Sequence, residues 1–247
     1  MHFGAKLFIE ALGLFWENRW AALRIAAVPV VFLLVFDLMW WSYPENDWLI
    51  WGNFAAWTIF IAWIAIAWHR HLLLENAVMP STFKRLGLAL IYGVLVIIFL
   101  LTGLLPFIGG LAFWDSSTLF EMSESHQVFV FSIVLVIGLV LGIYVLFRFG
   151  LVLPHLALDR GWLGFVQSWQ RTSGLGLGLW IYAALLAGLF ALPLPLEFTF
   201  EEAFETAPGL LLASCFSAFI AIIDITLLTR LYDYAMTRVA PKEGEAT

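Results

Sequence analysis

Six long apolar stretches constrain the fold of this chain more than any other feature of its sequence. A helix needs about 20 consecutive apolar residues to cross the hydrocarbon core of a bilayer. Of the 247 residues, 63% are hydrophobic and only 12% are charged, whereas soluble domains carry roughly 25% charged residues. We therefore predict one all-α integral membrane domain over residues 1–247, a bundle of six transmembrane helices. The predicted spans cover residues 21–41, 51–68, 86–105, 128–147, 175–192 and 210–228.

The basic residues are distributed asymmetrically between the loops. All 12 Lys and Arg residues lie before or at the start of the first span, between the second and third, between the fourth and fifth, or after the sixth. The other loops, at residues 42–47, 115–127 and 193–209, carry acidic residues but no Lys or Arg. Because Lys and Arg are retained on the cytoplasmic side, we expect a multi-pass protein of the bacterial inner (cytoplasmic) membrane. Both termini are then cytoplasmic.

Two amphipathic segments are predicted to lie in the membrane interface. Residues 2–17 place a polar side chain at every third or fourth position of an otherwise apolar helix, a pattern typical of interfacial helices. Residues 159–174 form the second segment, and we expect Asp159 to cap the N-terminus of its helix. We expect the whole stretch from residue 148 to residue 180 to lie along the inner surface, with an apolar face towards the acyl chains formed by Trp162, Phe165, Val166 and Trp169.

Asp224 is an acidic residue within the sixth predicted span. An acidic side chain at that depth costs on the order of 2–3 kcal/mol unless it faces protein or water. We expect Asp224 to lie inside the bundle, on a helix face shared with Ser217, and to pair with Arg70 or Arg148 at the inner boundary. A structural role is the preferred interpretation, and a proton or ion path is the alternative. Asp37, near the outer end of the first span, is expected to reach the headgroup zone or to pair locally.

Motifs for enzyme chemistry are not found in the sequence. It contains no nucleophile elbow, no HExxH motif and no phosphate-binding loop. His69 and His71 would point in nearly opposite directions on a helix and could not hold one metal ion together. The single cysteine, Cys215, has no partner for a disulfide and is expected to be a small buried hydrophobe. We therefore predict no catalytic residue, no cofactor, no metal site and no binding of nucleic acid.

The stretch from residue 148 to residue 180 carries a recognisable pattern. It reads RFGLVLPHLALDRGWLGFVQSWQRTSGLGLGLW. This pattern resembles the membrane domain associated with bacterial glycerophosphoryl diester phosphodiesterases and with six-helix inner-membrane proteins of the YciC type. The resemblance implies a fold and no reaction, because the phosphodiesterase chemistry belongs to an attached soluble barrel with metal-binding carboxylates. The matching positions are Arg148, Pro154, Asp159, Arg160, Ser168, Trp169 and Gly174.

These observations favour a non-enzymatic function. We expect an envelope component that organises membrane lipid or a partner protein in the membrane. The alternative, from another class, is a small transporter or channel that uses the intramembrane carboxylate of Asp224.

Overall fold

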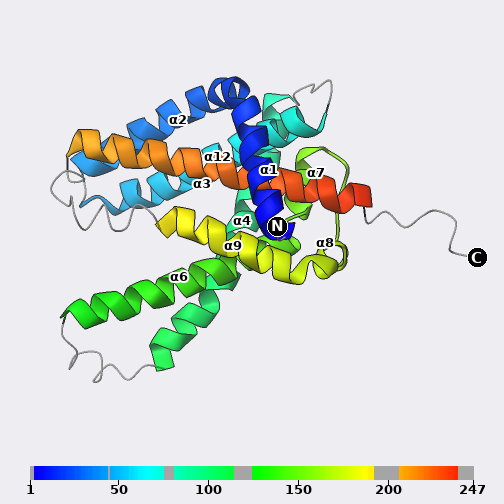
Figure 1. Ribbon diagram of the computed structural model, residues 1–247. Helices are drawn as coiled ribbons and strands as arrows, with labels where there is room; N and C mark the ends of the chain where they lie inside the picture. Colours follow the sequence, from blue (N-terminus) through cyan, green and yellow to red (C-terminus); the bar gives the residue numbers. More distant parts are fainter. Residues whose placement is uncertain (1–2, 44, 75–80, 114–123, 192–205, 239–247) are drawn as a thin grey trace, which may run out of the picture.

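Every regular element in the described part of the chain is a helix, which confirms the all-α prediction. The computed structural model describes residues 3–43, 45–74, 81–113, 124–191 and 206–238 (Figure 1). The predicted outer loops at 115–127 and 193–209 lie largely outside these residues. The helices in chain order are α1 (Phe3–Glu17), α2 (Arg19–Ser42), α3 (Asp47–Leu73), α4 (Thr82–Phe113), α6 (Glu124–Phe149), α7 (Val152–Ala157), α8 (Phe165–Thr172), the 3₁₀ turn η1 (Ser173–Leu175), α9 (Gly176–Ala191) and α12 (Ala207–Arg238).

Four segments are long and apolar enough to cross a membrane, and they overlap the first, second, fifth and sixth predicted spans. Helices α4 and α6 run through the third and fourth predicted spans, and α6 includes the shorter apolar segment Val136–Phe149. These lengths are consistent with a multi-pass membrane protein. The four segments are Arg19–Ser42, Asp47–Leu73, Phe165–Leu189 and Pro208–Thr237.

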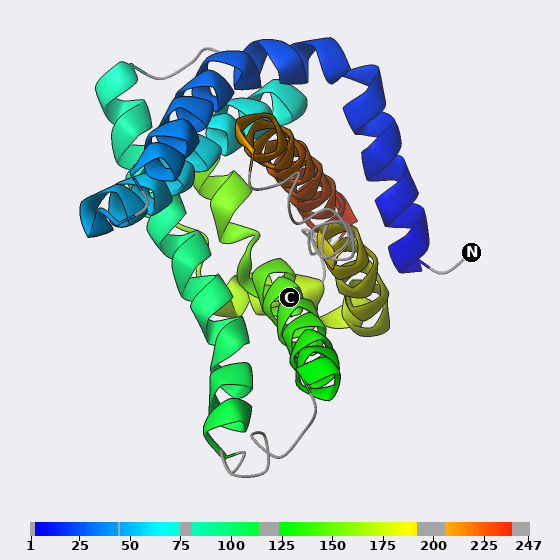
Figure 2. The same cartoon turned by 90° about the vertical axis from the view of Figure 1, so that its left-hand side faces the viewer.

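The long helices pack against one another in a ring. Going round the ring, α2 packs on α3, α3 on α4, α4 on α6 and α6 on α9. Helix α1 then bridges α9 and α12, and α12 returns to α2 and α3. Figure 2 presents α6, α9 and α12 nearly end-on, whereas α1 runs across α9 and α12 in Figure 1. The first and last helices of the chain therefore close the bundle.

The helix ends that carry basic residues gather at one end of the bundle, which we call the basic end. Helices α7 and α8 and the C-terminal end of α12 lie there, and the turn between α2 and α3 lies at the opposite end (Figure 1). Near the basic end α1 crosses α9 very closely. A Cβ atom on Gly4 would lie 2.2 Å from the carbonyl oxygen of Gly178, so only glycine permits this approach.

Helix α7 corrects the prediction that the whole stretch 148–180 lies along the inner surface. Leu151, Val152 and Ala157 are almost completely buried, and α7 packs against α3, α4 and α12. Gly150 permits the sharp turn from α6 into α7, because a Cβ atom there would lie 2.1 Å from the carbonyl oxygen of Leu146. The chain therefore turns back into the bundle before it reaches α8.

The mid-chain amphipathic helix also begins later than predicted. Helix α8 starts at Phe165 with Gly164 at its N-cap position, so the prediction that Asp159 caps it is wrong. Asp159 adopts a left-handed backbone with φ of 60°, which Asp tolerates better than most residues. Its carboxylate pairs with Lys84 of α4. Gly161, with φ of 88°, continues this turn and prevents a helix from starting earlier.

Candidate functional site

A hydrogen-bonded polar layer joins α3, α4 and α12 inside the bundle. Trp68 Nε1 donates to Thr226 Oγ1 at 2.8 Å. His69 Nδ1 lies 2.7 Å from Thr229 Oγ1, and His69 Nε2 lies 2.9 Å from the hydroxyl of Tyr92. All five side chains are buried. Sequence reasoning missed this layer, although the two threonines are three residues apart and therefore share one face of α12.

The proton positions in this layer follow from counting donors. The Thr229 hydroxyl donates its one proton to the carbonyl oxygen of Ile225 at 2.7 Å, so its oxygen accepts the Nδ1–H of His69. Nε2 of His69 then accepts the hydroxyl proton of Tyr92. Both nitrogens of a neutral imidazole are thereby satisfied. His69 is a structural residue that links α3 to α4 and α12.

Asp224 lies next to this layer. Its carboxyl group lies within electrostatic range of the phenol groups of Tyr92 on α4 and Tyr182 on α9. Its Oδ1 atom is buried without a hydrogen-bond partner in the described part of the chain, and so is the hydroxyl of Tyr182. Two buried polar atoms on α9 and α12 are therefore unsatisfied, at a cost of about 1–3 kcal/mol each.

The residues predicted to accompany Asp224 lie elsewhere. Arg70 Nη1 donates to the carbonyl oxygen of Ala157 at 3.0 Å, where the last carbonyls of α7 carry partial negative charge. Ser217 is exposed. The ion pairs among the described residues do not include Asp224, so the expected pairing with Arg70 or Arg148 is not found.

Arg148 ends α6 within a cluster that contains residues of the mid-chain pattern. It is 7% exposed, its guanidinium carbon lies 4.4 Å from the centroid of the Trp169 ring, and its Nε donates to Tyr144 at 3.0 Å. The carbonyl oxygen of Arg148 accepts hydrogen bonds from Ser168 Oγ at 2.9 Å and Thr172 Oγ1 at 3.3 Å. Helix α8 is thereby attached to the end of α6.

The side chains expected to face acyl chains are all exposed at the basic end: Trp162, Phe165, Val166 and Trp169. The rings of Phe165 and Trp169 also pack against Phe149 of α6. Contact of this surface with lipid stays a prediction.

Asp37 has the local partners that were one of its two expected environments, whereas Cys215 differs from its expected environment. Asp37 is buried between α2 and α3, where its Oδ1 accepts hydrogen bonds from Asn53 Nδ2 at 2.9 Å and from Trp57 Nε1 at 3.0 Å. It therefore joins two helices. Cys215 is exposed on α12, so the prediction of a buried hydrophobe is wrong.

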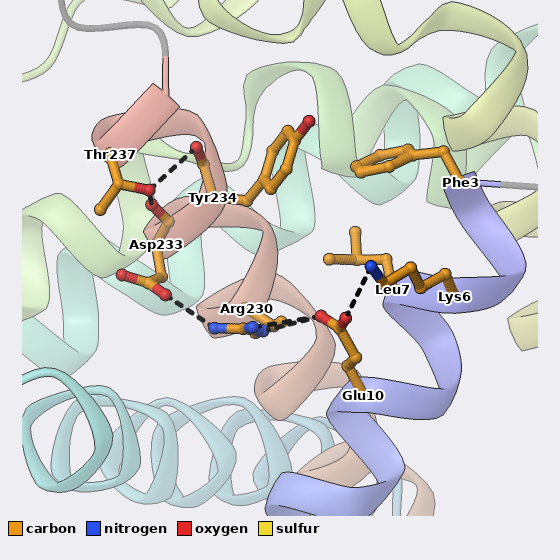
Figure 3. Close-up of a pocket in the computed structure, with 8 residues that line it drawn as sticks. All are labelled: Phe3, Lys6, Leu7, Glu10, Arg230, Asp233, Tyr234 and Thr237. Carbon is orange, nitrogen blue, oxygen red and sulfur yellow. Dashed lines mark hydrogen bonds and ion pairs between the residues drawn. The ribbon is translucent and has the colours of Figure 1, made fainter.

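A cavity of about 240 Å³ opens between α1 and α12 at the basic end, and we call it the α1–α12 cavity. Figure 3 shows side chains of both helices directed towards one another across it. The rings of Phe3 and Tyr234 pack together with their centroids 4.7 Å apart. The lining consists of Phe3, Lys6, Leu7 and Glu10 from α1 and of Arg230, Asp233, Tyr234 and Thr237 from α12.

The charged groups of the α1–α12 cavity balance one another. Arg230 Nη2 lies 3.1 Å from Glu10 Oε2, and Arg230 Nη1 lies 2.8 Å from Asp233 Oδ2. Lys6 Nζ lies 3.7 Å from the other oxygen of Glu10. All four side chains are partly exposed, so they remain accessible to a ligand. The cavity therefore offers cationic donors and anionic acceptors in equal number.

Comparisons with protein-family models, with curated proteins and with solved structures find no match. Within the described ranges, no group of three or more His, Cys, Asp or Glu side chains is placed to hold a metal ion.

Proposed function

We propose that this chain is a non-enzymatic protein of the bacterial inner membrane that binds and organises phospholipid at the cytoplasmic face. In this proposal α4 and α6 supply the third and fourth of six spans, and both termini are cytoplasmic. The separation of all 12 Lys and Arg residues from the other loops supports this orientation. The proposal includes kinship with the membrane domain that the mid-chain pattern, with its Arg148, Ser168 and Trp169, resembles.

The α1–α12 cavity is the observation that carries this proposal. Helix α12 has 32 residues, which makes it about 48 Å long at 1.5 Å per residue. The hydrocarbon core is only about 30 Å thick, so one end of α12 extends beyond it. Because the apolar span ends near residue 228, Arg230 and Asp233 lie at the depth of the headgroups.

The cavity chemistry matches a zwitterionic headgroup such as phosphatidylethanolamine. Lys6 and Arg230 offer donors to a phosphate, and charge-assisted hydrogen bonds of this kind are among the stronger ones. Glu10 and Asp233 offer acceptors to the ammonium group. Leu7 adds an apolar contact for the glycerol region. A ligand with one positive and one negative charge therefore leaves the net charge of the cavity unchanged.

Lipid-dependent stabilisation of the delipidated protein tests the proposal. The cavity variant Lys6→Gln/Asp233→Asn keeps the net charge, and the control Lys84→Gln/Asp159→Asn removes an exposed ion pair of the same composition. Phosphatidylethanolamine is expected to raise the thermal midpoint of the wild type and of the control more than that of the cavity variant. An equal rise in all three proteins would refute the assignment of the cavity.

A second candidate function, transport through Asp224, is favoured by the unsatisfied Oδ1 atom of this residue beside Tyr182. A proton path predicts that Asp224→Asn folds normally and abolishes a pH-dependent flux in liposomes, because the amide cannot carry the proton. The lipid proposal predicts that the wild type and Asp224→Asn produce the same flux as empty liposomes.

A further inference from the structure

A second cavity lies on the outer surface of α2, α3 and α4, apart from the α1–α12 cavity. It is a groove of about 380 Å³. Its walls are mostly apolar and include Val28 and Phe32 of α2 and Phe60 of α3. Two arginines, Arg24 of α2 and Arg85 of α4, also line it. We call this cavity the arginine groove.

The arginine groove has a direction. Arg24, Val28 and Phe32 follow one another at intervals of four residues on α2, so they lie along one face of the helix. Eight residues of helix separate Arg24 from Phe32 by about 12 Å. At the Phe32 end, the ring of Phe32 stacks on Phe60 with centroids 5.6 Å apart. The groove therefore has a charged mouth at the basic end and an apolar body that runs towards the middle of the bundle.

The charge at the mouth is not neutralised. Among the residues that the structure describes, neither Arg24 nor Arg85 forms an ion pair with a carboxylate. The guanidinium carbon of Arg85 lies 4.2 Å from the centroid of the Trp63 ring, and its Nη2 donates to the Trp63 carbonyl oxygen at 3.3 Å. Its Nε is buried with no hydrogen-bond partner in the described ranges, while Arg24 is exposed. Two positive charges without a carboxylate partner therefore line the mouth of the groove.

We propose that the arginine groove binds one anionic phospholipid, with its phosphodiester contacted by Arg24 and Arg85 and one acyl chain lying along Val28 and Phe32. Guanidinium groups match phosphate oxygens in geometry and charge. Among the residues that the structure describes, no carboxylate lines the groove to hold an ammonium group, so phosphatidylglycerol fits better than phosphatidylethanolamine. This site goes beyond the zwitterionic site of the α1–α12 cavity, and it rests on the same placement of the chain in a membrane.

Native mass spectrometry of the full chain with equal concentrations of phosphatidylglycerol and phosphatidylethanolamine tests this site. The groove variant Arg24→Gln/Arg85→Gln is expected to lose affinity for phosphatidylglycerol by about tenfold or more, since one charge-assisted hydrogen bond is worth roughly that factor. The control Arg19→Gln/Lys84→Gln removes the same charge from neighbouring positions of α2 and α4 and should retain phosphatidylglycerol like the wild type. An equal loss in both variants would assign the effect to overall charge and overturn the site.

A steric pair of variants tests the site without changing its charge. Val28→Trp fills the groove, whereas Val31→Trp adds the same side chain to an exposed position of α2 outside it. Only Val28→Trp should weaken retention of phosphatidylglycerol. If Val28→Trp retains this lipid as Val31→Trp does, the groove is not its site.

These measurements can refute the two proposed lipid sites independently. If phosphatidylethanolamine raises the thermal midpoints of the wild type and the cavity variant equally while phosphatidylglycerol still binds through Arg24 and Arg85, the proposed function is overturned and the arginine groove stands. If phosphatidylethanolamine gives the expected response but the groove variant binds phosphatidylglycerol as the wild type does, only the arginine groove is overturned.

Discussion

Replacing Thr229 by valine tests the polar layer that holds α3 against α12. Valine has nearly the same shape as threonine, so packing is kept while the oxygen that accepts the Nδ1–H of His69 is lost. The imidazole is completely buried, and a buried donor without a partner costs about 1–3 kcal/mol. For a chain of this size each kcal/mol lowers the thermal midpoint by about 2–4 °C. A cost near 2 kcal/mol therefore corresponds to a fall of roughly 4–8 °C.

The assay is thermal unfolding of the purified protein in detergent, with Thr237→Val as the matched control. Thr237 lies on the same helix, is exposed, and donates within α12 to the carbonyl oxygens of Asp233 and Tyr234. Its replacement should change stability by less than about 0.5 kcal/mol. If Thr229→Val unfolds at the same temperature as Thr237→Val, the hydrogen bond to His69 contributes nothing and the reasoning is wrong.

Three further predictions concern the helix crossing, a histidine and the topology. Gly4→Ala should destabilise the protein by about 1–3 kcal/mol through overpacking. Gly13→Ala should not, because a Cβ atom at Gly13 has no neighbouring atom within 4 Å. Equal thermal midpoints of the two variants would contradict the close crossing of α1 and α9. Burial lowers the pKa of His155 from its ordinary value of 6.5, so the unfolded chain takes up the proton first and stability falls as pH drops through 6.5. The stability of the His155→Gln variant should fall less than that of the wild type over the same pH range. Identical pH profiles of stability would contradict a role of His155 in this loss. In a cysteine-free background, an impermeant thiol reagent applied to whole cells should label Ser123→Cys and not Ser81→Cys, and the reverse pattern would invert the topology.

The helical class followed from the sequence because it depends on a local quantity, the length of each apolar stretch. The path after α6 did not, since Gly150 turns an apolar segment inward where its own pattern equally suits a membrane surface. The start of α8 was misplaced for a related reason. Asp159 is a good capping residue in isolation, but here its carboxylate pairs with Lys84 from a distant helix.

The polar residues were harder to place than the apolar ones. The position of Asp224 within an apolar span predicted that it lies inside the bundle. The structure brings it close to Tyr92 and Tyr182. Its partners could not be predicted, because several acceptors compete for each arginine. Arg70 donates to a helix-end carbonyl, and Arg148 stacks on Trp169. Helix spacing alone gives no information about such choices between elements.

The central claim is that this protein holds specific phospholipids at the basic end of its bundle. Its most direct test is native mass spectrometry of the full chain extracted from cell membranes in a mild detergent. The account predicts adducts of both phosphatidylethanolamine and an anionic phospholipid, with the first lost in Lys6→Gln/Asp233→Asn and the second lost in Arg24→Gln/Arg85→Gln. A chain that emerges free of phospholipid, or whose adducts are the same in both variants as in the wild type, would contradict it.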